Sequence, residues 1–179
     1  MPVLLGPINS GLAWGYYLLG EPETAREHAE RAIKIQSDTG TPFLLPLAYV
    51  ILGAVALDSG ELKNARSFIE EALSLAQNNN EKMLEGQSWV LLGSILGKAD
   101  LSQGGKAEEY ILQGIKIFDE LELKAWSPTA YLFLGELYTD MGQREKALET
   151  LKKAEAAFKQ MGIDYWPART QEVLDRLES

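Results

Sequence analysis

The sequence has no cysteine and a single histidine, His28. Without cysteine there can be no disulfide bond, thiolate metal ligand or cysteine nucleophile. One histidine cannot supply the paired ligands of a His-rich metal site. No apolar run approaches the roughly 20 residues of a membrane-spanning helix, and the opening residues lack the basic start of a signal peptide. These absences favour a cytoplasmic protein with no metal, no cofactor and no membrane partner.

Basic residues are also scarce relative to acidic ones. The 179 residues include 17 Lys and Arg against 26 Asp and Glu, a net charge of -9. Pairs such as Lys152-Lys153 are interspersed with acids and form no basic stripe, which argues against a nucleic-acid partner. Apolar residues make up 46% and charged residues 24%, so the chain should fold. The length suits one ordinary domain or a short array of repeats.

Familiar catalytic motifs are missing as well. His28 lies in no Gly-x-Ser-x-Gly or His-Glu-x-x-His pattern, and we expect it on the solvated outer side of a helix. Gly104-Gly105-Lys106 resembles part of a phosphate-binding loop but lacks the upstream glycine, so we interpret it as a turn. Adjacent carboxylates such as Glu70-Glu71 point about 100° apart on a helix and do not converge on one substrate. The sequence therefore predicts no enzyme.

What the sequence does contain is a repeat. A leucine followed by a small residue recurs at intervals of 40, 40 and 42 residues, at Leu12-Ala13, Leu52-Gly53, Leu92-Gly93 and Leu134-Gly135. Two further small residues follow each pair at similar spacing: Ala25 and Ala32, Ala65 and Ala72, Ala107 and Gly114, Ala147 and Ala154. Two extra residues within 99–105 account for the longer interval. Such a period indicates a stack of similar supersecondary units.

Each unit has the pattern of two helices. Apolar residues recur three and four positions apart, which is the helical period, and no stretch alternates as a strand would. Gly20, Gly60 and Gly142 are expected where the first helix of a pair ends and the chain reverses. Hydroxyl caps before a first-turn proline are expected at Thr41-Pro42 and Ser127-Pro128, and another start at Asn80-Glu81. We expect helices near 3–19, 22–37, 42–58, 61–78, 81–98, 104–120, 128–141, 143–160 and 167–178.

Small residues at fixed positions predict where the helices approach one another closely. Gly53, Gly93 and Gly135 would let the second helix of each pair come near the first. Trp126 and Trp166 are 40 residues apart and each precedes a first helix. We expect both to pack against the preceding second helix rather than to bind a ligand.

The pattern resembles the tetratricopeptide repeat (TPR). An aromatic residue (Tyr49, Trp89, Tyr131) precedes Leu-Gly by three positions, and Tyr16 or Tyr138, a glycine and two small residues complete the motif. The resemblance implies an all-α, right-handed superhelical solenoid, a single domain over 1–179. Its four hairpins are expected at about 1–40, 41–80, 81–122 and 123–162, with a polar capping helix at about 165–178. The long 40–42-residue period is similar to that of MalT-like regulators and cyclase–ATPase fusion signalling proteins.

In the TPR family the first helices line an inner groove that binds protein segments. The resemblance places fourteen residues in that groove: Trp14, Tyr17, Val50, Ala54, Leu57, Asp58, Gln87, Val90, Ser94, Lys98, Leu132, Glu136, Thr139 and Asp140. We expect a helical partner segment to bury apolar anchors near Leu57, Val90 and Leu132, and its basic residues to meet Asp58, Glu136 and Asp140. The Lys and Asn clamp that some members use for a peptide carboxylate is absent, because its positions hold Ser10, Val50, Val90 and Leu132.

Three functions remain open at this stage. The first is a non-catalytic scaffold for a protein or peptide partner, as the C-terminal regulatory segment of a larger bacterial signalling protein. The second is a homodimerisation module that uses the N-terminal helices, where Val3, Leu4, Trp14 and Tyr17 present apolar surface. The third is a sensor of a small effector, with Trp14, Tyr17 and Asp58 forming a pocket.

Overall fold

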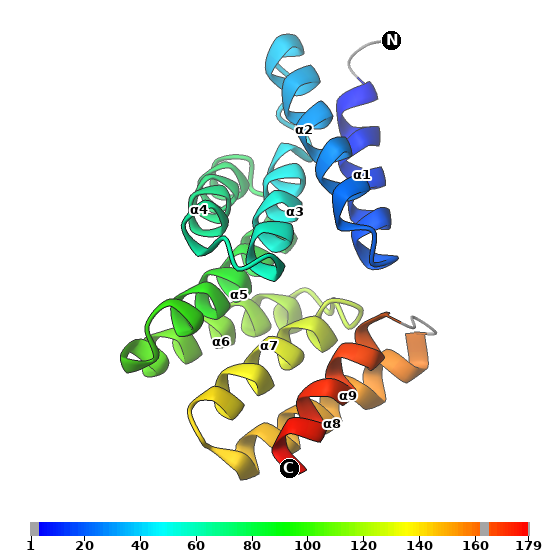
Figure 1. The fold of residues 1–179 in the computed structure, drawn as a ribbon. Coiled ribbons are helices and arrows are strands. Elements are labelled where there is room, and N and C mark those ends of the chain that lie inside the picture. Colours follow the sequence, from blue (N-terminus) through cyan, green and yellow to red (C-terminus); the bar gives the residue numbers. More distant parts are fainter. Residues whose placement is uncertain (1–3, 162–164, 179) are drawn as a thin grey trace. The chain divides into compact units, whose positions relative to one another are not determined.

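The computed structural model describes residues 4–161 and 165–178. All regular secondary structure within those ranges is helical, without a β-strand (Figure 1). The all-α prediction is confirmed, and most expected helix ends lie within two residues of those observed. The helices are α1 (Leu5–Leu18), α2 (Pro22–Thr39), α3 (Leu45–Asp58), α4 (Leu62–Asn78), α5 (Lys82–Ala99), α6 (Gly104–Glu120), α7 (Ser127–Asp140), α8 (Arg144–Met161) and α9 (Tyr165–Glu178), with a short 3₁₀ turn η2 (Leu101–Gln103) before α6.

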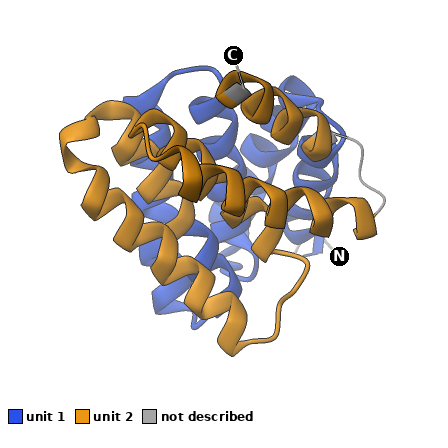
Figure 2. Ribbon diagram, turned by 90° about the horizontal axis from the view of Figure 1, so that it is seen from below, with its two compact units in different colours: residues 1–88 blue, residues 89–179 orange. Residues whose placement is uncertain are grey.

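Neighbouring helices pack pairwise as hairpins. α1 packs against α2, α3 against α4, and α7 against α8, while α2·α3, α6·α7 and α8·α9 contacts join successive hairpins. The contacts divide the chain into two compact units, residues 1–88 and 89–179, with the border inside α5 (Figure 2). No helix within 4–161 or 165–178 is long and apolar enough to cross a lipid bilayer.

Each unit has its own apolar core. In the first unit, the alanines of α2 and α4 give room for the large side chains of α3, and Ile51 and Ile69 are fully buried. In the second unit, the bulkiest fully buried side chains are those of Phe118, Phe133, Phe158 and Trp166. Trp166 stacks on Phe158 of α8, and Trp126 lies 6.4 Å from Phe118 of α6, so both tryptophans pack on the preceding second helix as expected.

The small residues of the repeat do allow close helix contacts. A Cβ added at Gly93 would lie 2.5 Å from the carbonyl oxygen of Ala107 and 2.6 Å from Ile111 Cγ1 in α6. A Cβ at Gly135 would lie 2.6 Å from Leu151 in α8, and one at Gly53 would overlap Ile69 in α4. A larger residue at Gly53 or Gly135 would require the facing side chain to move, whereas one at Gly93 would also meet backbone atoms of α6.

The helix ends follow the predicted glycines. Gly20, Gly60 and Gly142 have φ of 76°, 75° and 70°, the left-handed conformation that residues with a Cβ adopt only at a cost. The backbone N–H groups of the three glycines hydrogen-bond to carbonyls of the helix that is ending.

The two predicted hydroxyl caps, Thr41 and Ser127, are wrong. α3 begins at Leu45 rather than Pro42, because Leu44 takes a left-handed φ of 60° and breaks the helix there. Pro46, not Pro42, is the first-turn proline of α3. α7 begins at Ser127 itself, and the residue before it, Trp126, makes no side-chain cap.

Two smaller corrections concern α2 and α5. α5 begins at Lys82, and Asn80 has a φ of 56°, so it belongs to the end of α4 rather than to a cap. His28 is half-buried, not solvated. Its Nδ1 hydrogen-bonds with Asn9 Oδ1 at 2.9 Å, and its ring stacks on Tyr16 at 5.2 Å, so it fastens α2 to α1.

Candidate functional site

A buried carboxylate on α7 is the centre of a charged cluster in the second unit. Arg169 of α9 contacts Glu136 with two nitrogens, Nε to Oε1 at 2.9 Å and Nη2 to Oε2 at 3.3 Å. Lys98 Nζ of α5 lies 3.5 Å from Glu136 Oε2. The Glu136 side chain is only 7% exposed, so two cations compensate a carboxylate that has lost most of its water. We call Lys98, Glu136 and Arg169 the cluster.

Aromatic packing sets the position of Arg169. Its guanidinium lies 5.2 Å from the ring centre of Phe133 and 5.6 Å from that of Trp166. Trp166 itself is 1% exposed and stacks on Phe158. Because the guanidinium is planar and stacks on rings, this packing aims its two nitrogens at Glu136. The apolar contacts of α9 with α7 and α8 thus orient the polar cluster.

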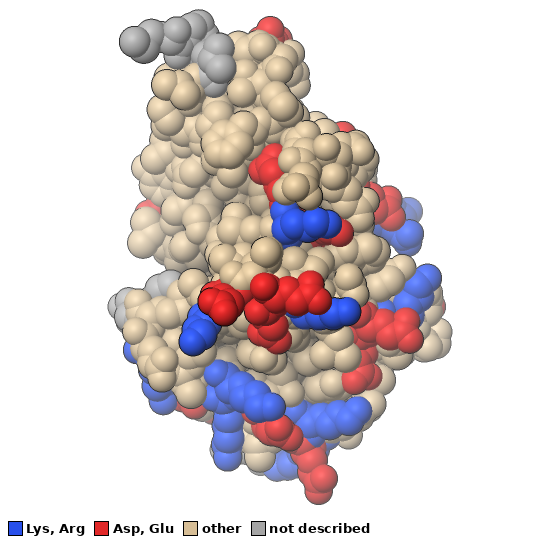
Figure 3. All heavy atoms as spheres, turned by 180° about the vertical axis from the view of Figure 1, so that it is seen from behind, with Lys and Arg blue, Asp and Glu red and all other residues tan. Residues whose placement is uncertain are grey.

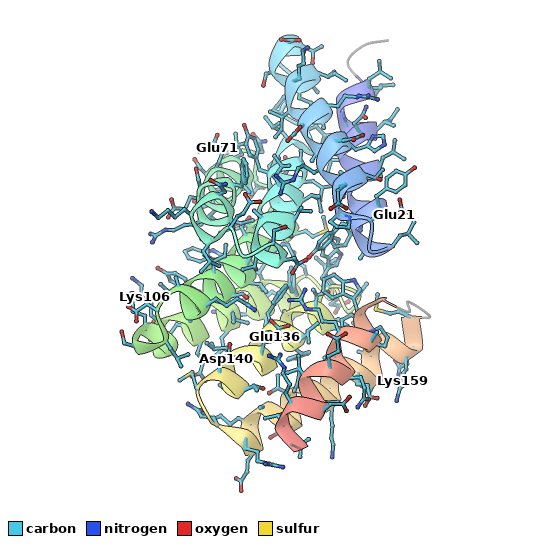
Figure 4. All side chains as sticks on the ribbon, viewed as in Figure 1. Glu21, Glu71, Lys106, Glu136, Asp140 and Lys159 are labelled. Carbon is cyan, nitrogen blue, oxygen red and sulfur yellow. The ribbon has the colours of Figure 1, made fainter. Side chains whose placement is uncertain are left out.

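The cluster opens onto a surface hollow of about 540 Å³ beside α9. The hollow is lined by Glu136, Arg169, Glu172, Val173, Asp175 and Arg176. On the other side of Glu136, α5 and α7 form a narrower crevice lined by Ser94, Gly97, Lys98, Phe133, Glu136, Leu137 and Asp140. Glu136 lines both, and Figure 4 shows it one turn before Asp140 on α7. The surrounding surface is therefore polar and of mixed charge.

The second unit brings part of the predicted groove together. Ser94, Lys98, Glu136 and Asp140 line the crevice, with Lys98 and Asp140 exposed. Thr139 is half-buried and donates its hydroxyl hydrogen to the Gly135 carbonyl at 2.8 Å.

The proposed contacts of three residues in this unit need correction. Val90 and Leu132 are 0% exposed and belong to the core, so they cannot serve as anchors for a partner. Glu136 cannot meet basic residues of a partner as expected, because Lys98 and Arg169 already occupy both its oxygens.

The predicted groove residues of the first unit form a separate group. The hydroxyl of Tyr17 donates to Asp58 Oδ2 at 3.0 Å, and the Trp14 ring lies 6.4 Å from that of Tyr17. Tyr17 is buried, whereas Trp14 is half-exposed and Asp58 exposed. The contact joins α1 to α3, so Tyr17 and Asp58 hold successive hairpins together.

The other predicted residues of this unit are buried. Val50, Ala54 and Leu57 lie in the core, so Leu57 is not an exposed anchor either. Gln87 is 4% exposed, and its Oε1 has no hydrogen-bond partner among the described residues. Five of the seven predicted groove residues of the first unit are therefore buried, and only Trp14 and Asp58 are accessible.

Two further observations bear on the chemistry of the surface. On the face seen in Figure 3, Lys and Arg side chains lie beside Asp and Glu side chains instead of forming a continuous basic stripe. Within 4–161 and 165–178 no group of three His, Asp or Glu side chains is placed to hold a metal ion.

Comparison with known protein families identifies the helical hairpins. A tetratricopeptide-repeat model matches residues 47–79 and 128–159, which are the α3–α4 and α7–α8 hairpins, and a second model of the same repeat matches residues 10–31 in α1 and α2. These three segments match the tetratricopeptide repeat. None of the curated proteins compared matches the sequence.

Several solved structures share this fold. Aspartyl phosphate phosphatase F from Bacillus subtilis matches 97% of this chain with a TM-score of 0.69 and 19% identity. A Rap protein complexed with Competence and Sporulation Factor matches 99% with a TM-score of 0.72 and 17% identity. A Signal Transduction ATPase with Numerous Domains from Pyrococcus horikoshii, described as having a TPR sensor, matches 98% with a TM-score of 0.61 and 18% identity.

At these identities the likeness is one of fold. The chain spans 45%, 47% and 26% of the length of these three proteins, so it corresponds to less than half of each. TPR domains are typically protein-interaction modules.

Sequence reasoning missed the contribution of α9 to the candidate site. Arg169, Glu172 and Arg176 line the hollow, yet the helix that carries them was expected only to cap the array. A signal was present, because Arg176 lies 40 residues after Glu136 and Glu172 lies 40 after Leu132. Extending the groove register of the TPR into the last half repeat finds both residues. Arg169 is outside that register, so only the packing of α9 identifies it.

Proposed function

We propose that this TPR chain is a non-catalytic interaction module that binds a segment of a protein partner at the hollow beside α9. The single observation that carries the proposal is the cluster, a buried carboxylate compensated by Lys98 and Arg169 at the edge of a surface hollow. A buried ion pair is a poor means of stabilising a fold, since apolar residues of similar volume often do as well or better. Its placement beside an open hollow favours a role in recognition.

The lining favours a charged peptide segment over a small effector. Small-molecule pockets are mostly apolar with few polar groups. Here Val173 is the apolar lining residue, while acidic Glu172 and Asp175 and basic Arg176 are exposed. A partner segment with basic residues would meet the two acids and Asp140, and an acidic residue would meet Arg176. Because these contacts are electrostatic and exposed, we expect salt-sensitive binding of modest affinity.

A regulatory role within a larger bacterial signalling protein is part of the same proposal. The 40–42-residue period supports it, as do the fold neighbours, which include a Rap protein complexed with Competence and Sporulation Factor and a Signal Transduction ATPase with Numerous Domains. Rigid helices present the recognition residues at little ordering cost, which suits a module that receives a signal from a partner.

A peptide-display selection against the immobilised chain tests the proposal. We expect enriched peptides to carry basic residues and to bind more weakly as salt is raised. Arg176→Glu should then change the affinity of the selected peptides at least several-fold. Lys153→Glu is the matched control, because it makes the same charge change on α8, where Lys153 pairs with Glu149. Equal effects of the two variants, or a selection without enrichment, would count against the hollow as the binding site.

A further inference from the structure

Lys98 is the looser of the two cations that face Glu136. Arg169 reaches both oxygens of that carboxylate by hydrogen bonds, at 2.9 and 3.3 Å. Lys98 Nζ lies 3.5 Å from Oε2, a charge contact that is too long for a good hydrogen bond. The Lys98 side chain is 36% exposed, whereas that of Arg169 is 16% exposed. An ammonium has three hydrogen-bond donors, so Lys98 keeps donors that Glu136 does not use.

Asp140 supplies the opposite charge in the same crevice. It lies one turn after Glu136 on α7, is exposed, and lines the crevice between α5 and α7 together with Ser94 and Lys98 (Figure 4). Within the described part of the chain, no ion pair joins Asp140 to Lys98 or to another cation. The crevice therefore presents a positive and a negative group that do not neutralise each other.

Close packing of α5 on α7 sets the positions of these two charges. Gly97 directly precedes Lys98, and a Cβ added to this glycine would lie 2.5 Å from Leu137 Cδ1. Lys98 and Asp140 are thus carried by two helices in direct contact, and the axes of packed helices are about 8–10 Å apart. Because both helices are already in place, a partner would bind with little ordering cost.

Charge complementarity specifies the partner residues that fit this crevice. We infer that the partner segment carries an aspartate or glutamate whose carboxylate binds Lys98, and a lysine or arginine that binds Asp140. In an extended segment, at about 3.3 Å per residue, helices about 8–10 Å apart place these two partner residues about two or three positions apart.

The inference rests on the proposed function, and it extends the binding site from the hollow beside α9 to the α5 side of Glu136. Lys98 is then a specificity-determining residue for a partner carboxylate. It is not part of the peptide-carboxylate clamp of other TPR proteins, because the clamp position on α5 holds Val90, which is buried.

Peptides enriched by display selection on the parent chain provide the test. One enriched peptide is synthesised as selected and with each acidic residue in turn replaced by glutamine. The peptides are titrated against the parent chain and Lys98→Met at low salt, followed by fluorescence anisotropy. Lys98→Met should weaken the selected peptide about two- to five-fold, the usual range for an exposed ion pair. It should leave the affinity unchanged for the peptide that lacks the carboxylate bound by Lys98.

Lys116→Met is the matched control. Lys116 is an exposed lysine of the same unit with one loose contact, 3.8 Å from Nζ to Glu120 Oε1. Its replacement removes the same charge and keeps a similar apolar stem, but away from the crevice. The affinities of all the peptides should stay at their parent values.

Asp140→Asn is a second variant that leaves the buried cluster untouched. It should weaken the selected peptide by a similar factor, and that loss should disappear when the basic residue bound by Asp140 is replaced by glutamine. Circular dichroism should show parent-like melting for Lys98→Met and Asp140→Asn, since Arg169 still compensates Glu136.

The outcomes distinguish a failure of this inference from a failure of the proposed function. If peptides lose affinity for Arg176→Glu but bind Lys98→Met and Asp140→Asn as tightly as the parent, the proposed function stands and the inference is wrong. The inference is also wrong if Lys98→Met weakens the selected peptide and all its glutamine versions equally, because the effect then needs no partner carboxylate. A selection that enriches no peptide overturns both.

Discussion

Replacing Gly93 by alanine tests the packing of the repeat at its tightest point. The added Cβ would lie 2.5 Å from the Ala107 carbonyl oxygen and 3.0 Å from the Ile111 backbone nitrogen. Side chains can turn aside, but these are backbone atoms of α6. The substitution therefore requires α6 to shift as a whole relative to α5.

The expected size of the effect follows from two opposing terms. Alanine in place of a mid-helix glycine stabilises a helix by about 1 kcal/mol. Overfilling a packed contact costs about 1–3 kcal/mol, and backbone obstruction places Gly93 toward the upper end. We expect a net loss of about 1–2 kcal/mol in the free energy of unfolding. For a chain of this length that lowers the melting temperature by about 2–8 °C.

Thermal unfolding followed by far-ultraviolet circular dichroism measures this effect. Gly105→Ala is the control, because Gly105 lies in α6 of the same unit and a Cβ there meets nothing within 4 Å. It should leave the melting temperature unchanged or slightly higher. A Gly93→Ala chain that melts at or above the parent temperature would refute the packing argument.

Two further substitutions probe polar groups of the second unit. Arg169→Met removes the two-nitrogen contact with buried Glu136 and leaves Lys98 as its cation, so unfolding in denaturant should show a loss of about 2 kcal/mol; an unchanged midpoint would contradict the cluster. Burial, together with donation to Glu108 Oε1 at 2.6 Å, raises the pKa of Tyr138 above its ordinary 10.0. Above pH 10 the unfolded chain therefore releases this proton first, and stability should fall as pH rises; Tyr138→Phe should remove that part of the alkaline loss.

The helix pairs could be predicted because single residues determine them locally. Gly20, Gly60 and Gly142 mark reversals that need a left-handed φ, and the sequence shows them directly. The start of α3 could not be found this way. Leu44 adopts a left-handed φ of 60° although leucine has no preference for it, so packing around the turn overrides the signal of Thr41-Pro42.

The candidate site was less predictable because it depends on contacts distant in sequence. The repeat register places Val90 and Leu132 at the same groove positions as Glu136. It does not show that packing of neighbouring helices buries Val90 and Leu132 completely. The contact of Arg169 with Glu136 joins residues 33 apart on two different helices. The repeat spacing predicts that Trp166 packs on α8, but it does not predict that this packing brings Arg169 to Glu136.

The short turn η2 has a consequence for how such a repeat array can change length. It lies within residues 99–105, where one repeat interval is two residues longer, and Asp100 accepts hydrogen bonds from Ser102 N at 3.0 Å and Gln103 Nε2 at 2.9 Å. Despite these extra residues, α5 and α6 still pack closely at Gly93. The connection between two paired helices thus tolerates insertions, because residues can be added there without changing how the two helices pack. An engineer wishing to graft a loop or a tag onto this protein should begin there.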